Sequence, residues 1–259
     1  EKRVQKKDLP FFMKLMENLN KNNFKCPKPI KNLNNKYISL IKKKPAALVS
    51  FLDGTSKGFT VAQAVSTRDF WVLTVLFAFM FMGISGLMVH LIPMLEDMNY
   101  ISAQAASILG LLFLLSGIGR IGAGLLADMI EIRLVMTGLI VCQLVGLVLL
   151  SMIGPSQIWL IGIFALVFGI GFGGTIPLRP FLIMQIFGAR AFGALQGLVQ
   201  GGAISAGMAG PVFYGWAFDT RGSYDLAIYA SVATIVMSIP LVYLLRKPQE
   251  IAIRLGEAF

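Results

Sequence analysis

The sequence predicts an all-α membrane protein with six transmembrane helices, and two observations support this fold class. Hydrophobic residues make up 56% of the 259 residues, and the mean hydropathy is +0.74. Soluble domains contain roughly 45–50% apolar residues. A helix needs about 20 apolar residues to cross a hydrocarbon core of roughly 30 Å. Six stretches are long enough, with approximate limits 70–95, 103–127, 134–153, 158–183, 192–217 and 226–245.

The part of the chain before the first span is strongly basic. Residues 1–69 hold 15 of the 23 Lys/Arg and 5 of the 13 Asp/Glu, which accounts for the whole net charge of +10. Because this charge is mixed with Asn and adjoins membrane spans, it indicates a basic cytoplasmic segment and not a nucleic-acid-binding domain. We predict a flexible linker over residues 1–58. Within it, the run Phe11 to Leu19 fits an amphipathic helix on the membrane surface, with lysines suited to anionic head groups.

Residues 59–69 are expected to form a short interfacial helix that leads into the first span. Thr60 and Gln63 have the spacing of a capping box, and Phe59 occupies the staple position before the cap. The lysine-rich start is expected in the cytoplasm, and six spans return the tail, residues 248–259, to the same side. The chain is thus expected in the plasma (cell inner) membrane with both its linker and its C-terminus cytoplasmic. Since it opens on Glu1, we read it as the later part of a longer protein.

Small residues and prolines mark specific places in the spans. Gly119, the GIGFGG run of the fourth span and the pair Gly197 and Gly201 suit close helix packing in lipid. Packing alone is one interpretation. The alternative is a transporter, because prolines are expected to interrupt the fourth and fifth spans, and broken helices are tolerated where they line a cavity. These prolines are Pro177, Pro180 and Pro211.

The loop after the second span, GLLADMIEIR, is similar to the signature loop of the major facilitator superfamily. Gly124, Asp128 and Arg133 match that loop. Three positions depart from its basic and glycine pattern, namely Met129, Glu131 and Ile132. The stretch GGTIPLRPFLIMQIFGARAFGALQGL most resembles the oxalate/formate antiporter and monocarboxylate transporter-like branch.

This resemblance covers residues 59–247 and implies the C-terminal six-span half of a carrier. It implies two three-helix inverted repeats over residues 70–247, with an N-terminal six-span half of the same transporter as partner. It also implies that Gly124, Asp128 and Arg133 belong to a gating loop, one that is weaker here because of the departures. Transport would proceed by alternating access around a site near the middle of the membrane.

Two arginines in apolar spans are the main candidates for substrate binding. Arg120 lies eight residues before Asp128, and Arg179 lies eight residues before Phe187, which places each about 12 Å from the inner end of its span. A charged residue at this depth costs about 2.5–3.5 kcal/mol and usually faces the protein interior. Since guanidinium binds a carboxylate bidentately, the two arginines predict an organic anion as substrate.

Each of these residues has a second interpretation. Arg120 is either a substrate ligand, as the resemblance implies for an arginine of the eighth span, or a structural partner of Asp128 or of a carboxylate in the other half. Arg179 either binds substrate or extends to the cytoplasm from a broken helix. Oxalate carriers have a lysine in the eleventh span, where this chain has Gln196 and Gln200. One cation and two amides favour a monocarboxylate unless Arg179 supplies the second charge.

His90, the only histidine, is a candidate for proton coupling because its unperturbed pKa lies near 6.5. A hydrogen-bonded packing role is the favoured alternative. We find no nucleotide-binding loop, catalytic dyad or metal-ligand cluster in the sequence. We therefore expect neither an enzyme nor a cofactor or metal, and no nucleic-acid partner. The lipid bilayer, the second half and a small organic anion are the expected partners. The competing hypotheses are a truncated, non-transporting scaffold or fragment, and a carrier for a different solute.

Overall fold

The computed structural model describes residues 9–22, 29–32, 35–41, 44–49, 58–154 and 157–246. The chain divides into two compact units, Glu1–Thr55 (unit 1) and Ser56–Phe259 (unit 2). The predicted tail, residues 248–259, lies outside the described residues.

Unit 1 is a small α+β unit. Its helix α1 packs against the edge strand β1 of a three-stranded antiparallel sheet with strand order β1-β3-β2. The elements are α1 (Leu9–Lys21), β1 (Pro29–Ile30), β2 (Ile38–Ile41) and β3 (Lys44–Val49). The prediction of a flexible linker over 1–58 was therefore wrong for the described residues. Strands of two to six residues are too short to produce a visible periodicity. The helix predicted at Phe11–Leu19 is confirmed as α1.

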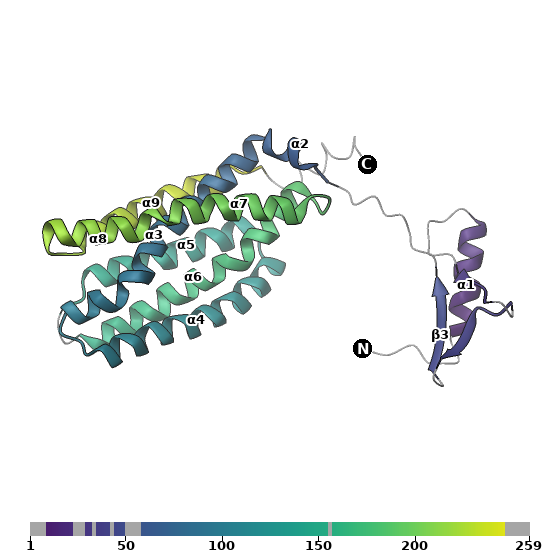
Figure 1. Cartoon of the computed structure of the whole chain (residues 1–259), viewed down its shortest axis with the longest axis horizontal. Coiled ribbons are helices and arrows are strands. Elements are labelled where there is room, and N and C mark those ends of the chain that lie inside the picture. Colours follow the sequence, from purple (N-terminus) through teal and green to yellow (C-terminus); the bar gives the residue numbers. More distant parts are fainter. Residues whose placement is uncertain are drawn as a thin grey trace. The chain divides into compact units, whose positions relative to one another are not determined.

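Unit 2 is a bundle of helices (Figure 1). They are α2 (Val61–Val65), α3 (Arg68–Asp97), α4 (Ser102–Met129), α5 (Ile132–Ser151), α6 (Ile158–Phe187), α7 (Phe192–Gly207), α8 (Ala209–Arg221) and α9 (Asp225–Leu244). Among the described residues, five helices are long and apolar enough to cross a membrane: α3, α4, α5, α6 and α9. The fifth predicted span, 192–217, falls instead on two shorter helices, α7 and α8.

The entry to the bundle has the predicted capping box. The Gln63 N–H donates to the Thr60 hydroxyl oxygen at 3.3 Å, and the Thr60 N–H donates to Gln63 Oε1 at 2.9 Å. Phe59, in the staple position, also contacts α6. Its N–H donates to the Phe187 carbonyl at 2.9 Å, and its ring lies 5.9 Å from that of Phe187. The entry segment is thus tied to the C-terminal end of α6.

Helices from the two halves of the bundle sequence pack against one another. The first long helix, α3, packs against the late helices α7, α8 and α9, while α6 packs against α4 and α5. Glycines allow the close contacts. A Cβ at Gly173 of α6 would overlap the carbonyl of Ser116 in α4, and one at Gly119 would overlap the Ile170 carbonyl. The predicted packing role is confirmed for these glycines. Gly197 and Gly201 have no described atom within 4 Å of a Cβ position.

The prolines have different effects in the two spans where we predicted interruptions. α6 runs continuously through Pro177 and Pro180, so the prediction of a broken fourth span was wrong. The other interruption is real, since α7 ends at Gly207 and α8 begins at Ala209. Pro211 has no N–H for the Gly207 carbonyl four residues earlier. The Ser85 hydroxyl of α3 donates to that carbonyl instead, at 2.6 Å.

Replacing Ser85 with alanine should destabilise this junction. The Gly207 carbonyl would lose its donor inside the bundle, at a cost of about 1–3 kcal/mol. We expect a lower midpoint of thermal unfolding for the detergent-solubilised protein. Ser205→Ala is the matched control, because Ser205 is exposed on α7 and should tolerate alanine. Equal midpoints for both variants would contradict the role of Ser85.

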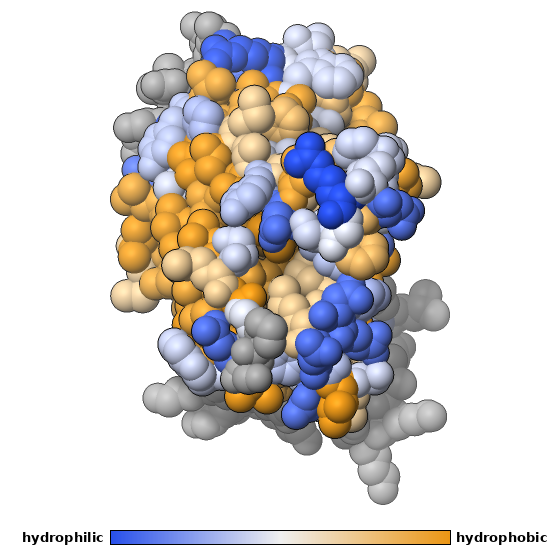
Figure 2. Space-filling view, turned by 90° about the vertical axis from the view of Figure 1, so that its left-hand side faces the viewer, coloured by the Kyte–Doolittle hydropathy of each residue, from blue (hydrophilic) through white to orange (hydrophobic). Residues whose placement is uncertain are grey.

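The outer surface of unit 2 is largely apolar on its sides. Figure 2 looks onto one end of the bundle and shows polar residues gathered over that end and apolar residues along the flanks. Large exposed hydrophobics occur on every long helix, for example Phe113 on α4 and Trp159 on α6, at 50% and 66% exposure. A water-soluble domain would bury most such residues. The bundle is therefore built for a lipid environment, as the composition predicts.

Candidate functional site

A cavity of about 190 Å³ lies between α3, α6 and α7. Side chains from α3 form one wall, side chains from α6 form a second, and α7 contributes Gln200. The residues that line it are Phe77, Met80, Phe81, Ile84, Phe172, Thr175, Ile176, Arg179 and Gln200. The cavity thus brings together two of the predicted substrate-binding residues, Arg179 and Gln200.

Arg179 is the charged residue of this cavity. It lies near the C-terminal end of the continuous helix α6, between the two prolines. Its guanidinium carbon lies 5.7 Å from the centroid of the Phe77 ring. Its Nε is buried and has no hydrogen-bond partner among the described residues, and no described carboxylate forms a salt bridge with it. A buried donor without a partner is costly, so a ligand that accepts from it would be bound favourably.

Polar groups on α6 and α7 complete the cavity wall. The Thr175 hydroxyl, one turn before Arg179, donates to the Phe172 carbonyl at 2.9 Å. Gln143 of α5 supports this turn, since its Nε2 lies 3.1 Å from the Gly171 carbonyl and 3.5 Å from Thr175 Oγ1. A guanidinium, an amide and an aromatic wall in a small cavity suit a small anion with an apolar part.

Arg120 lies outside this cavity, on an exposed side of α4. Its Nη2 donates to the Ser116 hydroxyl oxygen at 3.4 Å. Gly117 and Gly124, about one turn away on either side, have no described atom within 4 Å of a Cβ position. The helix surface around Arg120 is thus open among the described residues. No salt bridge joins Arg120 to Asp128. Its role in substrate binding stays a prediction.

Gln196 lies one turn before Gln200 on α7 but does not line the cavity. Its Oε1 is buried and has no hydrogen-bond partner among the described residues. The two glutamines therefore have different surroundings, although their spacing predicts a shared face. Gln200 faces the Arg179 cavity, whereas the role of Gln196 stays a prediction.

His90 holds three helices together near one end of the bundle. Its Nε2 lies 3.1 Å from the Pro211 carbonyl and its Nδ1 lies 3.4 Å from the Tyr224 hydroxyl. Because a carbonyl only accepts, Nε2 carries the hydrogen in the contact with Pro211. Burial, with Asp97 and Asp219 nearby, raises the pKa of Tyr224. This geometry favours the packing interpretation, and proton coupling by His90 stays a prediction.

Among the described residues, no hydrogen bond or salt bridge joins the three residues of the predicted gating loop to one another. Gly124 faces open space and Asp128 is exposed. Arg133 is buried at the start of α5, where its Nη2 donates to the Leu245 carbonyl after α9. Arg133 therefore ties two helix ends together, and the gating role of the loop stays a prediction.

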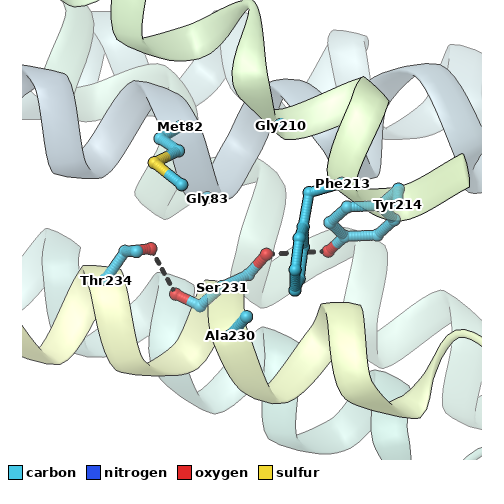
Figure 3. A pocket seen from close by; sticks show the side chains of 8 residues that line it. All are labelled: Met82, Gly83, Gly210, Phe213, Tyr214, Ala230, Ser231 and Thr234. Carbon is cyan, nitrogen blue, oxygen red and sulfur yellow. Dashed lines mark hydrogen bonds between the residues drawn. The ribbon is translucent and has the colours of Figure 1, made fainter. Parts of the chain in front are cut away.

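A second pocket, of about 80 Å³, lies between α3, α8 and α9 (Figure 3). Its hydroxyl groups are already bonded within the protein. Tyr214 Oη lies 2.8 Å from Ser231 Oγ, and the Thr234 hydroxyl donates to the Ser231 carbonyl at 2.9 Å. The remaining lining is mainly apolar, with Met82 and Phe213 on its walls. This pocket is thus suited to apolar groups and is a poorer candidate for an anion than the Arg179 cavity.

Sequence reasoning missed the aromatic wall of the candidate site. Phe77, Met80, Phe81 and Ile84 stand at positions i, i+3, i+4 and i+7 and share one face of α3. Their spacing was visible in the sequence. The helices that this face contacts could not be predicted from the sequence, because every face of this span is apolar.

The fold and the cavity define an integral membrane protein built of transmembrane helices. Two overlapping stretches of the sequence, residues 31–211 and 71–257, match the Major Facilitator Superfamily. The chain therefore belongs to the Major Facilitator Superfamily. Membership implies membrane transport of a solute, and it points to a transporter and not to an enzyme.

Short stretches of the chain are also similar to curated homoserine kinases. The homoserine kinase of Beijerinckia indica subsp. indica is 44% identical over 64 residues, which is 25% of this chain and 19% of the kinase. Those of a Chelativorans species and of Methylobacterium radiotolerans are 46% and 45% identical, over 21% and 22% of this chain and 17% of each kinase. The chain thus spans less than a fifth of the length of these relatives, too little to indicate kinase activity.

Proposed function

We propose that this chain forms the C-terminal half of a secondary carrier for a small organic anion, with a monocarboxylate as the favoured class. The observation that carries the proposal is the Arg179 guanidinium, which lies in a cavity between three helices and has a buried, unpaired Nε. A carboxylate would supply the missing acceptor and the missing negative charge. Gln200 would supply a neutral hydrogen bond, and Phe77 would cover the apolar part of the substrate.

The proposal includes six membrane crossings. α7 and α8 together hold 29 residues around the break at Met208, which at 1.5 Å per residue spans about 43 Å. One interrupted helix of this length is sufficient for a crossing. The proposal also includes two three-helix repeats: α3–α5, and α6–α9 with α7 and α8 counted as one interrupted helix. Their support is that α3, of the first repeat, packs against α7–α9, while α6, of the second, packs against α4 and α5.

The distribution of charge supports an orientation in the membrane. The last turns of α3 and α8 and the first residue of α9 carry Glu96, Asp97, Asp219 and Asp225 with one basic residue, Arg221. Basic residues at the opposite helix ends are Arg133, Arg190 and Arg246. By the positive-inside rule, the second set is cytoplasmic. In this arrangement the second half faces the Arg179 cavity, and substrate passes between the halves by alternating access.

Uptake into vesicles tests the proposed substrate class. We expect the complete carrier, reconstituted in liposomes, to take up or exchange labelled pyruvate, lactate, formate or oxalate. Absence of uptake for all four, with the protein folded and inserted, would contradict the proposal and would leave a different solute or a non-transporting scaffold.

Arg120→Ala tests whether α4 contributes a second cation to the site. If Arg120 faces the substrate across the half-domain interface, we expect loss of uptake while the amount of protein in the membrane is unchanged. Arg190→Ala, on the exposed connection after α6, is the matched control. Full uptake by Arg120→Ala would remove this residue from the site and leave Arg179 as the single cation.

A further inference from the structure

An exposed apolar surface lies on α1, in unit 1. Phe11, Phe12 and Leu15 are 64%, 40% and 39% exposed, and we call these three residues the Phe11 surface. The two phenylalanine rings are in edge contact, with centroids 5.7 Å apart. Met13, on the other side of the helix, is only 7% exposed. The apolar side of α1 is therefore wider than the part that the sheet covers.

Positive charge borders the Phe11 surface. Lys14 is exposed and lies one turn after Phe11 on the same helix. The acidic residue of α1, Glu17, is held by basic and polar neighbours: Lys21 Nζ lies 3.7 Å from its Oε1, and the Tyr37 hydroxyl lowers its pKa. Unit 1 as a whole has 13 Lys/Arg against 4 Asp/Glu. An apolar strip beside an exposed lysine, on a unit with a large excess of positive charge, is typical of helices that lie on anionic lipid.

We propose that the Phe11 surface docks α1 on the anionic lipid surface of the membrane that holds unit 2. Unit 1 is covalently joined to unit 2, so the chain that carries the Phe11 surface is also the chain that is inserted in the membrane. Two weak signals, apolar burial and attraction of lysines to anionic head groups, together suffice for stable surface binding when neither does alone. Pairing with a second copy is less favourable, because it would bring two strongly positive units together.

A fluorescent label at position 15 can test this in the intact protein. Leu15→Cys, made in a Cys26→Ser, Cys142→Ser background, would carry an environment-sensitive dye, and the protein would be placed in nanodiscs. We expect a blue-shifted emission that brominated lipids quench when the nanodisc contains phosphatidylglycerol, and loss of this quenching in pure phosphatidylcholine. Raising the salt to about 1 M, where the screening length is roughly 3 Å, should also release the dye.

Matched variants separate docking from folding. Lys21→Cys, labelled in the same way, reports on a polar position of α1 and should show little quenching by brominated lipids. Phe11→Ser with Phe12→Ser should abolish the quenching at position 15. Phe11 and Phe12 are exposed, and Lys21 is paired only at the surface. The variants should therefore keep the circular dichroism spectrum of the parent.

Three results would overturn the proposal. One is a dye at position 15 that stays open to aqueous iodide in anionic nanodiscs. Another is protection that does not depend on lipid charge but rises with protein concentration, which would indicate a second copy. The third is unchanged quenching in the double phenylalanine variant. Each is independent of whether the carrier transports an organic anion.

Discussion

Arg179→Ala is expected to abolish most substrate uptake by the complete carrier. Loss of a buried, charge-assisted contact costs about 3 kcal/mol, which corresponds to roughly 100-fold in substrate affinity. Because Arg179 already lacks a partner for its Nε, its removal should leave the cavity intact and the protein folded. Initial rates of uptake over a range of substrate concentrations would measure the effect.

Arg179→Lys is the informative companion variant. Lysine keeps the charge but loses the planar fork that binds both carboxylate oxygens, so we expect partial loss, about 10-fold. Gln200→Ala, which removes one neutral hydrogen-bonding group from the cavity lining, should cost less than Arg179→Ala, about 1 kcal/mol. Wild-type uptake by Arg179→Ala would contradict the placement of the substrate in this cavity.

Gly173→Ala should destabilise unit 2 strongly, although it adds one methyl group. The added Cβ would overlap the Ser116 backbone, which cannot rotate away as a flexible side chain would. α4 and α6 must then separate along their contact, at a cost of about 3 kcal/mol or more. We expect a large fall in the fraction of monodisperse protein that survives heating in detergent.

Gly162→Ala is the matched control within the same helix. No described atom lies within 4 Å of its Cβ position, so the methyl group meets open space. This variant should behave like the parent or gain slightly from the higher helix propensity of alanine, by up to about 1 kcal/mol. If both glycine variants melted alike, α4 and α6 would not be in backbone contact.

The sequence predicted the ends of several helices within two residues. The second predicted span, 103–127, corresponds to α4 at Ser102–Met129, and the sixth, 226–245, corresponds to α9 at Asp225–Leu244. Both are predominantly apolar runs flanked by polar residues, the strongest signal that a membrane helix produces. The prolines were less informative. Pro180 leaves α6 intact, whereas α7 ends near Pro211, where Ser85 from a distant helix satisfies the freed carbonyl.

The candidate site was predicted in its residue types but not in its arrangement. Depth along a helix follows from residue counting, so Arg120 and Arg179 were expected at one level. Rotation about the helix axis does not follow, because faces toward lipid and faces toward protein are equally apolar. Arg179 lines the cavity with Gln200, whereas Arg120 lies on the open side of α4. A water-soluble helix would have revealed its inner face by polarity.

The packing of α3 against the late helices α7, α8 and α9 has a consequence for synthesis of the chain. Ser85 of α3 bonds to Gly207, 122 residues later, and His90 bonds to Tyr224, 134 residues later. At about 5–20 residues per second, a ribosome needs roughly 6–25 s to make that stretch. During this interval α3 is without its final neighbours, while α4, α5 and α6 can already assemble. α3 therefore waits longer for its main packing partners than α4 waits for α6.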